Sequence, residues 1–95
     1  MKMVLMMADV ARLDAIRMDL KDLGAPGYTA CPVLEGAGRS GIHAGDRIHP
    51  GGLIMLMVAA PDADAEKLVD ELVRRRDQAA DRVTRLFILP VERMA

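Results

Sequence analysis

The residue types best suited to chemistry are concentrated in one glycine-rich stretch, residues 35–52. Its glycines include the spacing G-x-G-x-x-G, formed by Gly36, Gly38 and Gly41. A dinucleotide-binding motif of this kind needs a helix that starts at the glycines, whereas residues 42–52 contain Pro50 and show no helical periodicity. Arg39, among the glycines, can still pair with phosphate or carboxylate through two parallel hydrogen bonds. The pattern therefore does not indicate a Rossmann domain, but it is compatible with a ligand that carries phosphate.

A metal site is the second chemistry that this stretch suggests, because His43, Asp46 and His49 fall within seven residues. Zinc would want a third or fourth ligand with supporting contacts, and spacing within a loop constrains ligand geometry little. A solvated loop explains the same residues more simply. The methionines at positions 3, 6, 7, 55 and 57 are soft-metal ligands by type. Because these methionines lie in apolar segments, their role is better explained as filling the hydrophobic core.

Composition and charge exclude several functional classes. The 95 residues carry 13 Lys and Arg against 14 Asp and Glu. The chain therefore has no excess of positive charge of the kind that supports nonspecific nucleic-acid binding. No apolar run approaches the ~18 residues of a membrane span. No Ser-His-Asp or paired-carboxylate pattern supports an enzyme. The single cysteine, Cys31, cannot form an intrachain disulfide, and no signal peptide is recognisable, so we expect a cytoplasmic protein.

The elements that must position these residues follow from hydrophobic periodicity in what we expect to be one domain, residues 1–95. Asp9 can cap the first helix, and Gly24 can end it. Strands are predicted at Lys2–Ala8, Tyr28–Leu34, Leu53–Ala60 and Val83–Val91, a first helix at Val10–Leu23, and a second helix that opens at Pro61 and carries three arginines near its end. The order β-α-β-β-α-β is that of an α+β, ferredoxin-like fold with both helices on one face of an antiparallel sheet.

The two central strands of that sheet are expected to be Lys2–Ala8 and Leu53–Ala60, and both are apolar on both faces. Pro32 places the strand Tyr28–Leu34 at an edge instead. Two helices can cover only one face, and soluble monomers seldom expose a large apolar patch. We therefore predict an obligate oligomer whose sheets face inward.

The middle of the chain resembles the PII family of signalling proteins. The matching residues are Gly24-x-x-Gly27-x-Thr29-x-x-x-Val33, followed by Gly36-x-Gly38-Arg39 and His43. The match needs one inserted residue between Val33 and Gly36, and Gly41 is displaced by one position. The start MKMV, the order of elements and the Val-Ala-Ala-Pro-Asp entry to the second helix also agree.

The resemblance implies a homotrimer with sheets inward, which agrees with the argument from apolar strands. It also implies adenine-nucleotide binding in the clefts between subunits, and a loop at residues 35–52 that docks onto a transporter, channel or enzyme. By position, Thr29 would lie near the adenine, with Gly36, Gly38 and Arg39 near the phosphates.

The chain departs from the family pattern at three places. The family's second glycine-rich segment, T-G-x-x-G-D-G-K, is replaced by residues 76–82, which contain no glycine and leave Arg82 as the stand-in for the lysine. Ser40 replaces the glutamine that follows the loop arginine. The loop is also short and has no tyrosine.

Three hypotheses follow, and an enzyme is not expected. The first is a trimeric regulator that binds an adenine nucleotide such as ADP, AMP or ATP. The second is a metal-binding or metal-sensing trimer that uses His43 and His49. The third is a structural trimer whose loop docks a protein without any small ligand.

Overall fold

The computed structural model describes residues 1–38, 41–43 and 52–95. Four strands form the main sheet in the order β2-β5-β1-β6, with every neighbouring pair antiparallel. In chain order the elements are β1 (Lys2–Asp9), η1 (Val10–Arg12), α1 (Leu13–Asp22), β2 (Thr29–Val33), β3 (Gly36–Gly38), β4 (Gly41–His43), β5 (Leu53–Ala60), α2 (Asp62–Gln78) and β6 (Arg85–Pro90). The predicted ferredoxin-like α+β fold is confirmed, with the central and edge strands as expected.

The connection from β1 to α1 is built by a capping carboxylate. The side chain of Asp9 accepts a hydrogen bond from the backbone N–H of Ala11 at 2.9 Å, which starts the single 3-10 turn η1. The α-helix proper then begins at Leu13. Gly24, with φ of +71°, ends it in the left-handed conformation that glycine adopts without a steric penalty.

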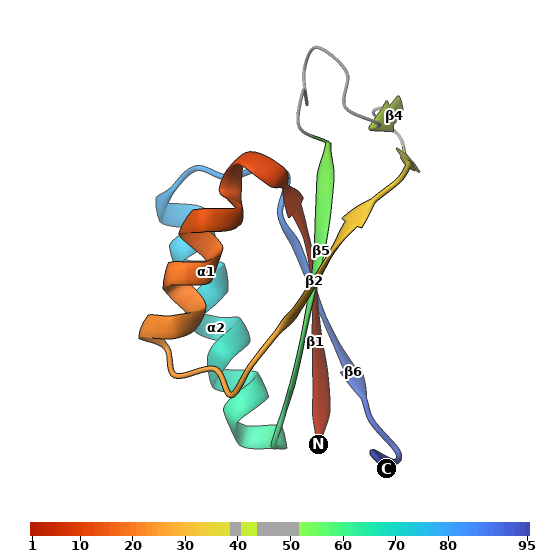
Figure 1. Cartoon of the computed structure of the whole chain (residues 1–95). Coiled ribbons are helices and arrows are strands. Elements are labelled where there is room, and N and C mark those ends of the chain that lie inside the picture. The colour runs from red at the N-terminus through yellow and green to blue at the C-terminus, as the bar shows by residue number, and fades with distance from the viewer. Residues whose placement is uncertain (39–40, 44–51) are drawn as a thin grey trace.

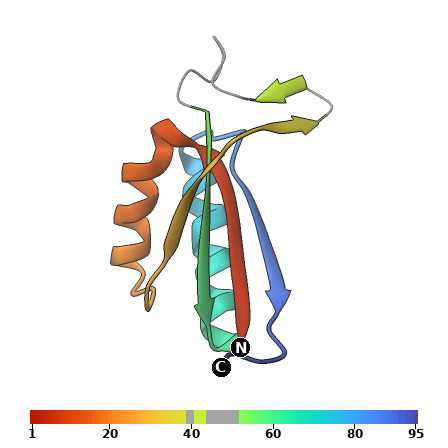
Figure 2. The ribbon, with the colours of Figure 1, turned by 45° about the vertical axis from the view of Figure 1, so that its right-hand side comes forward.

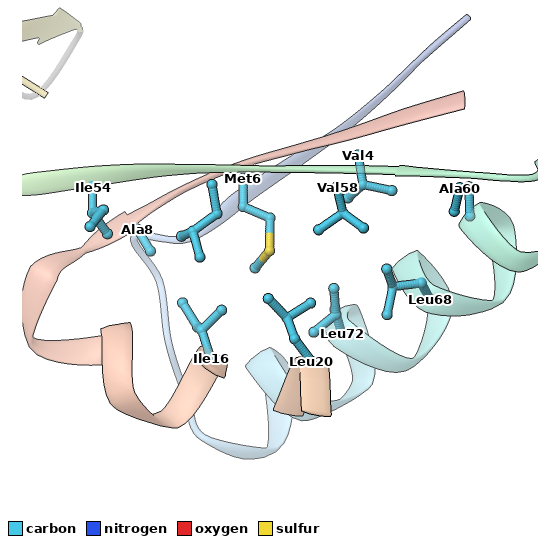
Figure 3. Packing of buried hydrophobic residues seen from close by; sticks show 12 residues of the cluster. Val4, Met6, Ala8, Ile16, Leu20, Ile54, Val58, Ala60, Leu68 and Leu72 are labelled. Carbon is cyan, nitrogen blue, oxygen red and sulfur yellow. The ribbon is translucent and has the colours of Figure 1, made fainter. Parts of the chain in front are cut away.

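Both helices lie on one side of the main sheet (Figure 1). The even-numbered residues of β1 from Val4 onward, and those of β5, point toward the helices and are buried, as the alternation of side chains along a strand requires. In Figure 3 the side chains of Val4, Met6 and Val58 point from the sheet toward Leu20 and Leu72 on the helices. The core therefore fills the space between the sheet and the helices.

The other side of the main sheet carries no helix among the described residues (Figure 1). The antiparallel register places the odd-numbered residues of β1 and β5 on this side, together with their partners on the edge strands. We call this surface the open face; its apolar members are Met3, Leu5, Met7, Cys31, Val33, Leu53, Met55, Met57, Ala59, Phe87 and Leu89. Phe87 and Leu89 are 46% and 45% exposed in the single chain.

Several details differ from the sequence prediction. The first helix, predicted at Val10–Leu23, opens with the 3-10 turn Val10–Arg12 and is α-helical over Leu13–Asp22. The expected loop contains a small two-stranded sheet, in which β3 pairs with β4 and Gly36 lies opposite His43. The last strand begins at Arg85 and not at Val83, because the carboxylate of Asp81 holds the N–H groups of Val83 and Thr84 in a turn. Neither the pairing of β3 with β4 nor the turn at Asp81 has a hydrophobic periodicity that a sequence pattern would reveal.

We predict that Leu20→Ala lowers the free energy of unfolding by about 2–5 kcal/mol, because the Leu20 side chain is 1% exposed and its loss leaves a cavity between α1 and the sheet. Leu34→Ala is the matched control, since Leu34 is 94% exposed and should change stability by less than about 0.5 kcal/mol. Urea unfolding at one fixed protein concentration measures both. Equal losses for the two variants would contradict the packing described above.

Candidate functional site

A pocket of about 420 Å³ opens on the open face, beside the segment that joins α1 to β2. Two odd-numbered positions of β5 and one of β1 form part of its wall, and the α1–β2 segment together with Thr29, the first residue of β2, forms the remainder. The lining residues are Met3, Pro26, Gly27, Tyr28, Thr29, Met57 and Ala59. The pocket therefore lies where the uncovered sheet meets a turn rich in glycine and proline.

The shape of the α1–β2 segment is set by how the helix ends. After Gly24, the N–H of Ala25 donates to the carbonyl of Leu20 at 3.0 Å, which turns the chain back across the end of α1. Pro26 and Gly27 then lead into Thr29, the first residue of β2. Thr29 pairs with Met57 on β5, so its side chain is placed on the open face beside the pocket.

The lining of this pocket suits the binding of an apolar group more than catalysis. Methionine side chains supply soft, adaptable apolar contacts. Among the described lining residues no carboxylate, imidazole or amine is present, and the polar groups are the hydroxyls of Thr29 and Tyr28 with the backbone. Such a surface can hold a flat, uncharged ring and orient it through a few hydrogen bonds.

Two of the predicted phosphate contacts, Gly36 and Gly38, lie outside this pocket. Gly36 and Gly38 are the ends of β3, in the small hairpin that projects beyond the main sheet (Figure 2). A Cβ at Gly36 would lie 3.4 Å from Cδ1 of Leu53, an ordinary contact. Arg39 lies outside the described residues.

Within one chain, Thr29 and this hairpin are at opposite ends of β2. The strand runs from Thr29, opposite Met57, to Val33, opposite Leu53, and it rises about 3.3 Å for each residue. The hairpin follows Val33, whereas the pocket lies at the Thr29 end. One chain therefore does not bring Thr29 together with Gly36 and Gly38.

Arg82 is exposed in the turn between α2 and β6, at the end of the sheet where β1 finishes. Beside it, Asp81 has a side chain that is only 5% exposed and is surrounded by donors. Its carboxylate accepts the N–H of Val83 at 2.9 Å, the N–H of Thr84 at 3.0 Å and the hydroxyl of Thr84. The guanidinium of Arg12 lies 3.3 Å away. The N–H groups of Val83 and Thr84 and the Thr84 hydroxyl thus already donate to the carboxylate of Asp81.

The pKa of Asp81 reflects these contacts. Burial alone raises it, but the hydrogen bonds from Thr84 and Val83 and the charge of Arg12 outweigh burial, so the pKa lies below its ordinary value of 3.8. The folded state therefore holds this carboxylate in its charged form, and the turn depends on that charge.

The metal hypothesis gains no support from the described part of the chain. No group of three or more His, Cys, Asp or Glu residues placed to hold a metal ion occurs there. His43 lies on β4, while His49 and Asp46 lie outside the described residues. Metal binding by these side chains stays a prediction.

Sequence reasoning does not identify the β-strand side of the pocket. By sequence, Met3 and Met57 resemble filler for an aromatic-poor core, and only the pairing of β1 with β5 shows that they share one uncovered face with Ala59. The available signal is the odd-numbered alternation in both segments. It gives the face of each strand, but not which residues of the two strands are neighbours.

The whole chain matches a known protein family. Residues 1–95 match the family model described as nitrogen regulatory protein P-II. No curated protein matches significantly. Among the described residues, no helix has the length and apolar character needed to cross a membrane.

Several solved structures share the fold. One structure of CPII, a nitrogen regulatory PII-like protein from Thiomonas intermedia K12 bound to ADP, AMP and bicarbonate, superposes with a TM-score of 0.69 and 24% identity, over 93% of this chain and 88% of that one. A second structure of CPII with the same ligands gives 0.68 and 23%, over 97% and 88%. A protein of Thermus thermophilus, described as a PII-like signalling protein, gives 0.66 and 21%, over 92% and 81%.

We predict that Asp81→Asn destabilises the protein by about 1–3 kcal/mol at neutral pH, because the amide cannot replace a carboxylate among these donors. The folded pKa is lowered, so the stabilisation is fully present above 3.8 and is lost as the pH falls through that value toward the folded pKa. Urea unfolding between neutral pH and pH ~3 should therefore show a shallower acid decline in Asp81→Asn than in the parent. Asp14→Asn, at a side chain that is 95% exposed, serves as the control and should follow the parent curve.

Proposed function

The chain belongs to the nitrogen regulatory protein P-II family, and from that premise we propose that it binds an adenine nucleotide between subunits and signals to a partner protein through residues 35–52. The observation that carries the proposal is the apolar pocket beside Thr29 on the open face. Its volume of about 420 Å³ lies within the range of small-ligand sites. The CPII structures, bound to ADP and AMP, give the class of ligand to test.

The adenine ring is the part of the ligand that this pocket would accept. Its flat faces are apolar and would rest against Met3, Met57 and Pro26, while its edge carries hydrogen-bonding nitrogens. The hydroxyls of Thr29 and Tyr28, and the backbone at Gly27, are the polar groups of the lining that would meet that edge. This assignment agrees with the role that the family resemblance gives to Thr29.

The site is completed by a second copy of the chain. Apolar side chains from all four strands lie on the open face, and burying a few hundred Å² of them stabilises an assembly by several kcal/mol at about 25 cal/mol per Å². We propose a homotrimer with the open faces inward. Since Thr29 and the β3–β4 hairpin are far apart in one chain, the hairpin of a neighbouring subunit would supply Gly36, Gly38 and Arg39 to the phosphates.

The occupied turn after α2 favours a ligand with few phosphates. The N–H groups of Val83 and Thr84 already donate to Asp81 and are not free for an anion. Arg82 is exposed and can approach a phosphate, but it is a single charge. We therefore propose that AMP and ADP bind more tightly than ATP.

Signalling would use residues 35–52, whose described strands β3 and β4 lie at the end of the main sheet opposite the two termini (Figure 2). A ligand can shift such a segment only by as much as it binds one arrangement more tightly than another. A phosphate held by Arg39 would provide that difference, because its contact exists only when the segment lies against the cleft. A transporter, channel or enzyme that recognises this arrangement is the class of partner that we propose.

Calorimetry with ATP, ADP, AMP and cyclic AMP tests the nucleotide. We expect saturable binding of AMP and ADP, and about tenfold weaker binding for Arg39→Ala, since one charge-assisted contact to phosphate is lost. Thr29→Val should weaken all adenine ligands to a similar extent, whatever their phosphate count. Arg17→Ala, at an exposed arginine of α1, should bind like the parent. The absence of a saturable heat of binding with all four nucleotides would contradict the proposal.

Phe87→Glu tests the assembly separately. A charge at this position of the open face must be desolvated in the trimer, so we expect the variant to dissociate at concentrations where the parent holds three copies of the 10.3 kDa chain. Met18→Glu is the control, because Met18 is 57% exposed on α1, away from the open face. Light scattering gives the mass of each variant. A parent that runs as a monomer at micromolar concentration contradicts the proposed trimer.

A further inference from the structure

A second pocket of about 610 Å³ lies between the end of α1 and the first half of α2. It takes residues from the α1–β2 segment, from the junction of β5 with α2, and from α2 itself. Its lining is Leu23, Gly24, Ala25, Pro26, Ala60, Pro61, Asp64, Lys67, Leu68 and Glu71. Only Pro26 also lines the open-face pocket, so this second pocket, which we call the helix-side pocket, is separate from the proposed nucleotide site.

The floor of the helix-side pocket is apolar and belongs to the rigid core. Ala60 is 1% exposed and Leu68 is 6% exposed, and Leu23 and Ala25 pack against the same core cluster. These side chains are fixed by contacts with the sheet beneath them, so the floor is preformed. A ligand with an aliphatic or aromatic group could cover it without rearranging the helices.

Two opposite charges, those of Asp64 and Lys67, stand at the rim of the helix-side pocket. They are three residues apart on α2, a spacing at which an acid and a base are neighbours on a helix surface. The same spacing joins Asp14 to Arg17 at 3.4 Å and Glu71 to Arg74 at 2.5 Å. Within the part of the chain that the structure describes, neither Asp64 nor Lys67 forms an ion pair.

Two neighbouring carboxylates on α2, and the remaining charged residue of the lining, are already paired. The amino group of Met1 lies 2.6 Å from Asp62, and Lys2 lies 2.7 Å from Glu66. Glu71, the remaining charged residue of the lining, is held by Arg74. Among the described residues, the rim therefore offers one unpaired carboxylate and one unpaired ammonium group above an apolar floor.

We propose that the helix-side pocket binds an α-amino acid with an apolar side chain. Such a ligand carries its ammonium and carboxylate on one carbon, and these groups would pair with Asp64 and Lys67 respectively. Its side chain would rest on Leu68 and Ala60. A ligand of a single charge would leave one of the two rim groups without a partner, so the arrangement selects a zwitterion.

Backbone amide chemical shifts of the full chain, titrated with L-leucine as the probe, test this inference. We expect saturable shifts at Gly24, Ala25 and Leu68, and about tenfold weaker binding by leucinamide and by N-acetyl-leucine, each of which keeps one charge. Asp64→Asn and Lys67→Met should each weaken L-leucine about tenfold. Asp70→Asn and Lys21→Met are matched controls, because both residues are exposed and neither lines the pocket.

Each alternative outcome overturns the inference in a recognisable way. Equal binding of leucine and leucinamide would show that the pocket selects a cation and not a zwitterion. Unchanged affinity in Asp64→Asn and Lys67→Met would place the leucine site elsewhere. Absence of saturable shifts at millimolar L-leucine would exclude the amino acid class. The titration uses no nucleotide, so its failure leaves the proposed nucleotide function intact.

Discussion

The structure depends on one constraint: β1 and β5 are apolar on both faces, and the helices can cover only one. The covered face gives the core, where Leu56 and Val58 are at most 1% exposed. The uncovered face presents methionines to solvent in the single chain. A surface of this kind is stable in water when another copy buries it. The proposed assembly and the pocket beside Thr29 therefore have the same physical origin.

The short α1–β2 segment links the features that matter for binding. Gly24 ends α1 in a conformation that other residues adopt only with strain, and the chain then passes between the two pockets at Pro26. A ligand in either pocket would contact this segment. If each ligand binds one position of Pro26 more tightly than another, the two affinities are coupled, and that coupling must be equal in both directions.

Much of the fold could be predicted from the sequence, because hydrophobic periodicity and the glycine and proline residues that end helices and strands are local features. The strand Leu53–Ala60 has the predicted bounds, and Pro32 correctly indicates an edge strand. The turn at Asp81 and the pairing of β3 with β4 rest on hydrogen bonds that no hydrophobic pattern records. Thr29 is found through the family motif, whereas Met57 becomes a pocket residue only once the register is known.

We propose that the open faces meet in a trimer and that the nucleotide lies at the interfaces between subunits. A crystal structure of the unmodified chain grown with AMP and ADP tests it most directly. We expect three copies with their sheets inward, and nucleotide density between subunits with the adenine against Thr29 of one chain and the phosphates near Arg39 of its neighbour. A structure in which the open face stays exposed to solvent, or in which the nucleotide lies away from Thr29, would contradict it.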